Sequence, residues 1–407
     1  MNPPGTVRTR PPRRQFGVSL IELMISVTIG LLLMSGLVTL FVNSSDAERE
    51  SRKASEQIEN GRYAIDVISQ DLRIAGFYGP FNPTSNTSFV PTSLPDACDT
   101  AIASLQSALG LPVQGFQTGT SFSATATPST SCATWLTSAN LAEGSDILVV
   151  RRADTTAVVP GAATTAGEVY LQANPQTLAI QAGGGTTSCT SDASGGSTAT
   201  ITRKCLNPPT SDVCPTTCAA STTPAGEIRK LRVHIYFVAP CSLPANGSDI
   251  CTGATDDSGS PIPTLKRLEI TAASGATTFK IYPIAEGVQY MKVEYGIDDQ
   301  TGVKNVNAAN NTNLDTGLIG DGSPDRYTYS PSLADYSNVV SVRVDLLMRN
   351  RQQSQGYVDS KTYSLGVDPA SPSTAYLSLG PYNDGYRRHV YAAETRLINL
   401  SGRKENP

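Results

Sequence analysis

The chain has 407 residues, with 31 basic and 35 acidic side chains and a formal net charge of −4. Charged residues make up only 16 % of it, while Ser, Thr, Ala and Gly are abundant, especially between residues 82 and 226. This composition suits a secreted β-rich domain with long loops better than a compact cytosolic enzyme. A mildly acidic chain also gives no electrostatic reason to expect a nucleic-acid partner.

The chain opens with a basic leader, which a long apolar run follows. Four arginines and no acid precede Gly17: Arg8, Arg10, Arg13 and Arg14. From Val18 to Val42 the only charged residue is Glu22. A helix of that length, at about 1.5 Å per residue, spans the hydrocarbon core of a bilayer, and it is too long for the apolar region of a cleavable signal peptide. The arginines predict that the N-terminus stays cytoplasmic while the bulk of the chain is exported.

Glu22 does not suit a plain membrane anchor, because an ionisable group within an apolar helix is costly unless it has a partner. One interpretation is that its side chain snorkels to the lipid headgroups. The surrounding residues favour another. The stretch "FGVSLIELMISV" (Phe16–Val27) resembles the N-terminal signature of type IV prepilins and pseudopilins.

That resemblance implies roles for three residues. In the family a prepilin peptidase cuts after a glycine, here Gly17, and methylates the new N-terminus, here Val18. Glu22 would be the subunit-assembly residue, and the N-terminal ammonium of a neighbouring subunit would pair with it and offset the desolvation of both groups. Two features depart from the family pattern: position 18 is valine rather than Phe or Met, and no proline lies in the apolar run.

We expect one helix from about Ser19 to about Ile74. Its first half, residues 18–43, is the transmembrane or filament-core segment, and residues 44–80 form the amphipathic half. Apolar or small residues recur in that second half at spacings of three and four: Ile58, Gly61, Ile65, Ile68 and Leu72. This periodicity predicts a helix that packs one face on a domain.

Residues 81–226 are rich in Ser, Thr and Gly, with few predicted strands (146–153 and 168–173) and a short helix at about 100–109. The eight cysteines of the chain are Cys98, Cys132, Cys189, Cys205, Cys214, Cys218, Cys241 and Cys251. An even number in such surroundings predicts disulfides in an oxidising compartment, with nearest neighbours paired as the working assumption. A metal site at Cys214-x-x-x-Cys218 is the alternative, but its spacing lacks a second matched pair.

Residues 227–407 carry the strongest strand pattern, as in "RKLRVHIYFVA", where apolar and polar side chains alternate. Several strands after a single long helix predict an α+β, pilin-like fold, in which the amphipathic half of the helix packs on an antiparallel sheet with loop-rich insertions. Three stretches resemble the PilW branch of minor pilins, which is also similar to the J-type pseudopilins of type II secretion: residues 71–79, 285–299 and 386–400.

Catalytic motifs are missing from the sequence, and only two histidines occur, His234 and His389. A lone histidine in a strand is usually structural, so we expect no catalytic residue and no enzyme activity. Residues 386–391 hold an aromatic and basic cluster that nucleic acid could favour. Because the chain is acidic overall, we interpret these side chains as solvent-facing strand residues instead.

A loop rich in Asp, Asn and Gly follows the mid-sheet strand. Its carboxylates include Asp298, Asp299, Asp321 and Asp325. Calcium takes six to eight oxygen ligands from such flexible loops, so a calcium site is one interpretation. Asp, Asn and Gly are also the residues that turns require, and the loop lacks the closing Glu of an EF-hand, so a plain loop without a cofactor is the preferred one.

The resemblance implies a minor pilin that a prepilin peptidase processes and that takes part in type IV pilus assembly, in a priming complex at or near the tip. Its partners would be other minor pilins, the major pilin, the inner-membrane assembly platform and a tip adhesin. It would pass from the inner membrane, with most of the chain periplasmic, to the fibre. The alternatives are a J-type pseudopilin at the tip of a type II secretion pseudopilus and, from another class, an exported enzyme or binding domain on a signal anchor.

Overall fold

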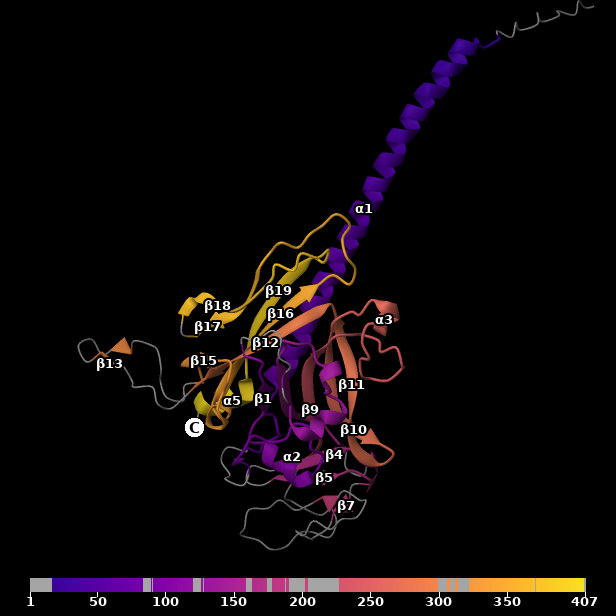
Figure 1. Ribbon diagram of the computed structural model, residues 1–407. Helices are drawn as coiled ribbons and strands as arrows, with labels where there is room; N and C mark the ends of the chain where they lie inside the picture. Colours follow the sequence, from indigo (N-terminus) through magenta and orange to yellow (C-terminus); the bar gives the residue numbers. More distant parts are fainter. Residues whose placement is uncertain are drawn as a thin grey trace, which may run out of the picture. The chain divides into compact units, whose positions relative to one another are not determined.

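The computed structural model describes residues 17–82, 89, 91–119, 126, 128–158, 163–173, 178–186, 188–189, 202–203, 227–298, 306–307, 312–313, 322–369 and 371–405. Of the predicted leader, residues 1–16 therefore lie outside the described residues. The chain divides into two compact units, Met1–Ala54 and Ser55–Pro407. Helix α1 begins in the first unit and ends in the second (Figure 1).

Helix α1 runs without interruption from Leu20 to Arg73, which confirms the prediction of a single long helix. No proline occurs within it, so nothing removes a backbone donor along its length. Every side chain from residue 18 to residue 44 is exposed. The apolar window of the helix has a mean hydropathy of 2.3, so the helix is long and apolar enough to cross a membrane.

The second unit contains a seven-stranded sheet whose strand pairs are all antiparallel, with a central order of β1-β2-β9-β10-β11. Strand β4 adds to β9, and β5 adds to β4. The bounds are β1 Val113–Phe116, β2 Ile147–Ala157, β4 Val169–Ala173, β5 Leu178–Ala182, β9 Glu227–Ala239, β10 Thr264–Ala273 and β11 Ala276–Glu286. Both strands predicted between residues 81 and 226 are present as β2 and β4.

A second antiparallel sheet has the order β15-β12-β16-β19. Its strands are β12 Val288–Ile297, β15 Arg326–Thr328, β16 Val339–Arg349 and β19 Arg388–Arg396. A separate hairpin, β17 Tyr363–Asp368 with β18 Ser371–Leu379, packs against it. Pro283 lies in β11, at the edge of the first sheet, where a missing N–H costs no ladder bond.

Short elements complete the described part of the chain. The helices are α2 Ile102–Ala108, α3 Asp256–Gly259, α4 Leu333–Tyr336 and α5 Ile398–Glu405, with 3₁₀ turns η3 Thr130–Thr134 and η4 Ser138–Asn140. Three two-residue pairs are β3 Ala163–Thr164 with β6 Gly185–Thr186, β7 Ser188–Cys189 with β8 Thr202–Arg203, and β13 Val306–Asn307 with β14 Thr312–Asn313. Helix α2 corresponds to the short helix that the sequence predicts there.

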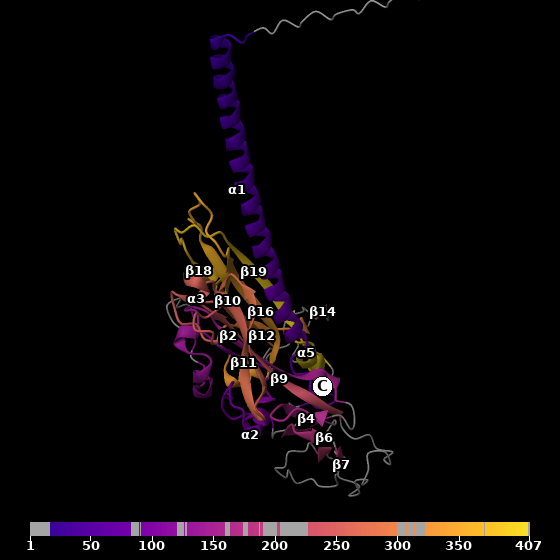
Figure 2. The same cartoon turned by 90° about the vertical axis from the view of Figure 1, so that its right-hand side faces the viewer.

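The domain-bound half of α1 covers one face of both sheets, and this packing forms the first core (Figure 2). Ala64, Ile68 and Leu72 of the helix are almost fully buried there. They contact a cluster that includes Tyr236 of the first sheet and Val293 of the second. A helix that buries one face in this way stabilises the unit mainly through apolar area removed from water, at about 25 cal/mol per Å².

Gly61 shows how closely the helix approaches the second sheet. A Cβ at this position would lie 2.5 Å from the ring of Tyr391 on β19, so a larger residue has no room. On either side of this contact, Gln57 Nε2 donates to the carbonyl of Met348 and Asn60 Nδ2 donates to that of Glu286. These contacts fix the position of the helix on the sheets within the second unit.

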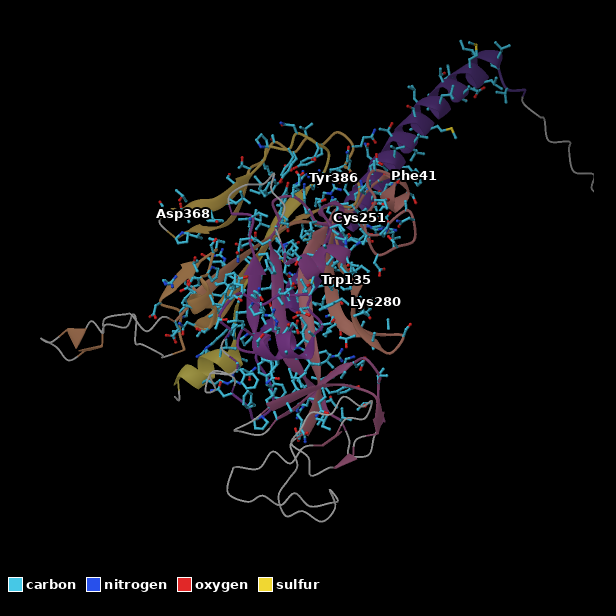
Figure 3. All side chains as sticks on the ribbon, turned by 60° about the horizontal axis from the view of Figure 1, so that its bottom comes forward. Phe41, Trp135, Cys251, Lys280, Asp368 and Tyr386 are labelled. Carbon is cyan, nitrogen blue, oxygen red and sulfur yellow. A yellow bond between two sulfur atoms is a disulfide. The ribbon has the colours of Figure 1, made fainter. Side chains whose placement is uncertain are left out.

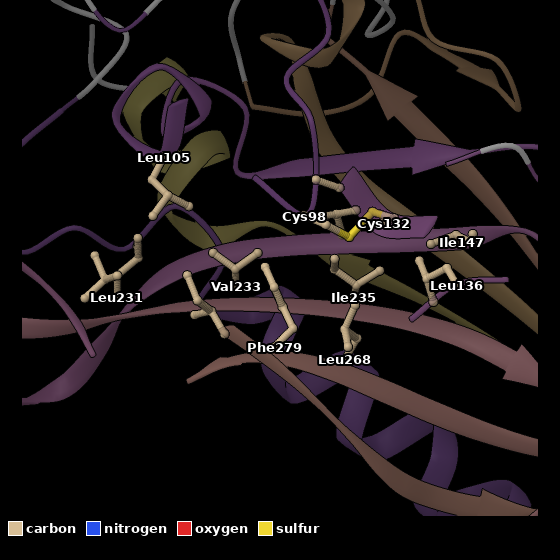
Figure 4. Close-up of a cluster of buried hydrophobic side chains, with 14 of the residues drawn as sticks. Cys98, Leu105, Cys132, Leu136, Ile147, Leu231, Val233, Ile235, Leu268 and Phe279 are labelled. Carbon is tan, nitrogen blue, oxygen red and sulfur yellow. A yellow bond between two sulfur atoms is a disulfide. The ribbon is translucent and has the colours of Figure 1, made fainter. Parts of the chain in front are cut away.

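A second core lies on the opposite face of the first sheet, where described residues between positions 78 and 180 pack (Figure 4). Val233 and Ile235 of β9 point into it, together with Leu268 and Phe279. Leu105 of α2 closes the other side. The described residues of the region 81–226 thus supply many side chains of this core as well as strand β2, which pairs with β1 and β9.

Two disulfides are present in the described residues. Cys98 and Cys132 are joined inside the second core (Figure 4), and Cys241 and Cys251 close the loop after β9. Both bonds join cysteines that are neighbours in sequence order. Only the backbone of Cys189 is described, and Cys205, Cys214 and Cys218 lie outside the described residues.

Candidate functional site

The junction between Gly17 and Val18 lies immediately before α1. The helix starts at Leu20, and the carbonyl of Ser19 accepts its first backbone bond, from the N–H of Leu23 at 3.0 Å. The peptide bond between Gly17 and Val18 therefore lies outside the helical ladder. Both residues are exposed, and no atom lies within 4 Å of the place where a Cβ on Gly17 would be. Among the described residues outside its own chain neighbours, none therefore covers this bond at Gly17.

Glu22 occupies the first turn of α1 and is exposed among apolar neighbours such as Ile21 and Leu23. Within the described residues its carboxylate makes no ion pair. The positive end of the helix dipole favours an acid here by only about 0.3–1 kcal/mol. A charge in the centre of a bilayer costs about 2.5 kcal/mol or more. The helix dipole therefore offsets only part of the cost of placing Glu22 in a bilayer.

Several hydroxyl groups of the same segment differ from Glu22, since they are satisfied within the helix. Ser26 Oγ donates to the carbonyl of Glu22 at 2.7 Å, and Thr39 Oγ1 donates to that of Ser35 at 2.9 Å. Such bonds to the preceding turn are the usual way for Ser and Thr to lie in an apolar helix. In the described part of residues 18–42, Glu22 is the only charged side chain, and it forms no ion pair there.

A buried polar network lies where the end of α1 meets the first sheet. Asp71 Oδ2 forms a hydrogen bond of 2.6 Å with His234 Nδ1 of β9, and the hydroxyl of Tyr236 donates to the same oxygen at 3.1 Å. Arg152 Nε of β2 donates to Asp71 Oδ1 at 2.6 Å. The side chains of Asp71 and His234 are only 5 % and 4 % exposed, so the network is shielded from solvent.

Glu269 continues this network on the other side of the histidine. Its Oε1 lies 3.6 Å from His234 Nε2 and accepts from Arg232 at 2.6 Å. Burial raises the pKa of Asp71, but His234 and Arg152 outweigh burial and lower it to about 2. Cationic neighbours likewise outweigh burial at Glu269 and lower its pKa to about 2. The network thus joins the end of α1 to the first sheet.

Substitution of Asp71 by asparagine is expected to destabilise the protein by about 3 kcal/mol, because it leaves Arg152 and His234 buried without their counter-charge. Unfolding of the purified full chain in detergent measures this. Asp66→Asn, at an exposed carboxylate of the same helix, is the matched control and should change stability by less than about 0.5 kcal/mol. Equal effects of the two variants would contradict a structural role for the network.

The same network predicts how stability depends on pH. A carboxylate whose pKa is lowered by folding stabilises the folded state above its unfolded pKa, and this contribution disappears as the pH falls. With folded pKa values of about 2 for Asp71 and Glu269, the loss is expected between about pH 4.5 and pH 2. Asp71→Asn should flatten the stability curve in this window.

Glu294, on the second sheet, has a pKa shift in the opposite direction and therefore the opposite effect on the pH dependence of stability. It is only 4 % exposed, on β12. Burial raises its pKa to about 7; Arg343 opposes this effect and Asp345 adds to it. Its stabilising contribution is therefore complete at low pH and is lost as the pH rises from about 4.5 to about 7. The second sheet should thus become less stable toward alkaline pH.

Glu294→Gln is expected to raise the free energy of unfolding at pH 8 by about 1–2 kcal/mol and to change it little at pH 5, because glutamine removes the cost of ionising a buried acid. Denaturant titration at the two pH values measures the difference. Glu143→Gln, at an exposed acid, serves as the control. A gain at pH 5 that equals the gain at pH 8 would argue against titration of Glu294.

The structure corrects the interpretation of the aromatic and basic cluster at residues 386–391. The expectation of solvent-facing side chains is wrong for Arg388, which is 7 % exposed. Its guanidinium forms ion pairs with Asp359 at 2.8 Å and with Asp384 at 2.7 Å. Because these carboxylates already neutralise it, Arg388 fixes loops in place and offers no charge to nucleic acid.

Two of the four residues predicted for calcium are described. The carboxylate of Asp298 is buried and accepts a hydrogen bond from the N–H of Gly322 at 3.0 Å. The N–H of Asp325 donates to the carbonyl of Ile297 at 2.8 Å. Asp299 and Asp321 lie outside the described residues, so the calcium site stays a prediction.

Comparison with known proteins agrees with the sequence motifs. Residues 253–399 match the family described as type IV pilus-assembly protein W, and residues 12–38 match the prokaryotic N-terminal methylation motif. No curated protein matches the chain significantly. A solved type IV-like pilin from Thermus thermophilus is similar at 13 % identity over 42 % of this chain and 79 % of its own, with a TM-score of 0.18. A TM-score that low does not support a functional comparison. The relation to the pilus-assembly family therefore rests on the two sequence matches.

Proposed function

The chain is a PilW-family protein with a type IV pilin N-terminus, and we propose that it acts as a minor pilin in pilus assembly. In this proposal a prepilin peptidase removes residues 1–17 and methylates Val18. The mature chain then joins a complex of minor pilins that primes fibre growth at or near the tip. Its role is structural, and the proposal assigns it no reaction of its own.

The observation that carries this proposal is Glu22. The carboxylate lies in the first turn of an exposed apolar helix, on the fifth residue after the bond that the peptidase would cut, and has no ion-pair partner within the described residues. Cutting that bond creates an ammonium group on Val18. In a bundle of parallel helices, the ammonium of one subunit can reach the carboxylate of the next, which compensates both charges and sets the axial register.

The second unit supports the same role. The helix half from Ser55 to Arg73 is fixed to two sheets by apolar packing and by the hydrogen bonds of Gln57 and Asn60. A force that acts on the helix would therefore be transmitted to the whole second unit. The chain would begin in the inner membrane with its N-terminus cytoplasmic and would then enter the fibre, where its partners are the major pilin and the other minor pilins.

A strain that lacks the gene tests the proposal. We expect the loss of most surface pili, restoration by the wild-type gene, and mature chain in the sheared fibre fraction of the complemented strain. Normal piliation together with loss of secretion of exported enzymes would instead favour the J-type pseudopilin. Normal piliation with normal secretion would exclude both assembly roles.

A further inference from the structure

Three hollows lie next to one another in the second unit and form one groove. Their volumes are about 520, 410 and 370 Å³. The first two share Gln353, and the second and third share Asp257, Ile262 and Arg351. We call this surface the loop groove. The loop after β9, the loop after β16 and the loop before β19 line it, and Figure 3 labels one residue of its wall, Tyr386.

Aliphatic side chains mark the two ends of the loop groove. Leu243 lines the third hollow and is 68 % exposed, while Val358 lines the first and is 61 % exposed. Among the large apolar residues that are described in the second unit, these two are the most exposed. Exposed aliphatic groups beside a cavity indicate a surface that another molecule covers.

The middle of the loop groove is polar but carries little free charge. Arg351 is paired with Glu286 at 2.8 Å, and Asp384 is paired with Arg388. The other polar groups of the groove are largely carboxamides, which belong to the exposed side chains of Gln352, Gln355 and Asn383. A carboxamide both donates and accepts hydrogen bonds, as a peptide group does.

The walls of the groove contain residues with a left-handed backbone conformation. Four described residues other than glycine have a positive φ, and three of them line the groove: Asp257 (50°), Ser258 (61°) and Asn383 (54°). The carboxylate of Asp257 holds its loop by accepting from the backbone N–H groups of Ser242, Leu243 and Ile262. Strained backbone that its surroundings enforce is typical of preorganised binding surfaces.

We propose that the loop groove binds an extended polypeptide segment of a neighbouring pilus subunit. Aliphatic side chains of the segment would pack on Leu243 and Val358, and its peptide groups would bond to the carboxamides between them. Because Arg351 and Asp384 are ion-paired and the carboxylate of Asp257 accepts from backbone N–H groups, the segment needs no net charge, and binding should depend only weakly on salt.

The position of the groove in the second unit points to a neighbour in the same fibre. Its rim residue Glu286 accepts a hydrogen bond from Asn60, and Arg387, beside its wall, accepts one from Gln57. The groove therefore lies at the end of the unit where the domain-bound half of the helix begins. This inference rests on the proposed function, since subunits joined through their N-terminal helices would meet at this end.

Photo-crosslinking of the full chain in piliated cells tests the inference. A benzophenone amino acid is placed at position 243 or 358, and at position 94 as the control, because Leu94 is 48 % exposed but lines none of the hollows. Each of the other pilus subunits carries an epitope tag in turn. We expect an adduct with a tagged subunit at positions 243 and 358, about tenfold above that at position 94.

The possible results distinguish failure of the groove assignment from failure of the proposed function. If the mature chain is present in the fibre fraction but positions 243 and 358 give no more adduct than position 94, the groove assignment is wrong and the minor-pilin role stands. An adduct with lipopolysaccharide alone would also overturn the polypeptide assignment. If the chain keeps its leader and never enters the fibre, the proposed function itself fails.

Discussion

Glu22→Ala is expected to leave leader removal intact and to lower the amount of the chain in sheared fibres by roughly 100-fold. The variant keeps the apolar helix and the cleavage junction, since Glu22 makes no ion pair with any described residue. It does leave the ammonium of a neighbouring subunit without its carboxylate. Loss of one partner of a buried pair costs about 3–5 kcal/mol, which corresponds to a factor of 100 or more.

Immunoblots of membrane and fibre fractions measure both steps of this experiment. Glu48→Ala is a matched control in the same helix, because Glu48 is exposed and pairs only within its own helix, with Arg52. The control should be processed and incorporated like the wild type. Glu22→Asp should recover part of the incorporation, since it restores the charge at a shorter reach. Normal incorporation of Glu22→Ala would show that Glu22 is not an assembly residue.

Gly17→Ala should stop leader removal, with cleavage slowed by roughly 100-fold or more. The substitution does not disturb the chain itself, because no atom lies within 4 Å of the new Cβ and Gly17 precedes the helix. The effect must therefore arise in the peptidase, where a methyl group that shifts the scissile bond by about 1 Å is enough to cost this factor.

Gel electrophoresis measures leader removal in this variant, because the uncleaved precursor and the mature chain differ in size. Gly36→Ala is the control, since its Cβ also meets open space and it lies in the same apolar segment. We expect normal processing of the control and accumulation of full-length precursor for Gly17→Ala. Processing of Gly17→Ala at the wild-type rate would rule out cleavage after Gly17.

The helix was the most predictable part of the fold. Its apolar run and the repeats of three and four from Ile58 to Leu72 place α1 within one residue at each end. Strand β9 was also predictable, because apolar and polar side chains alternate from Leu231 to Phe237. Strands β1 and β5 were missed. They have only four and five residues, so alternation has too few positions to show.

The buried network was beyond the reach of sequence reasoning for a physical reason. His234 and Asp71 are 163 positions apart, and nothing in a single sequence shows that the end of a helix meets a particular strand. One feature of the sequence is consistent with a buried Asp71. It directly precedes Leu72, an apolar residue of the face that packs on the domain, near the end of the amphipathic half. The motif from which the cleavage junction is predicted, in contrast, consists of residues that are adjacent in the chain.

The mass of the N-terminal peptide from chain recovered in sheared fibres tests the central claim most directly. The account predicts a peptide that begins at Val18, carries one N-terminal methyl group and lacks residues 1–17. The same preparation from Gly17→Ala cells should contain almost none of this peptide. Fibre-associated chain that retains its leader, or that begins at any residue other than Val18, would contradict the account.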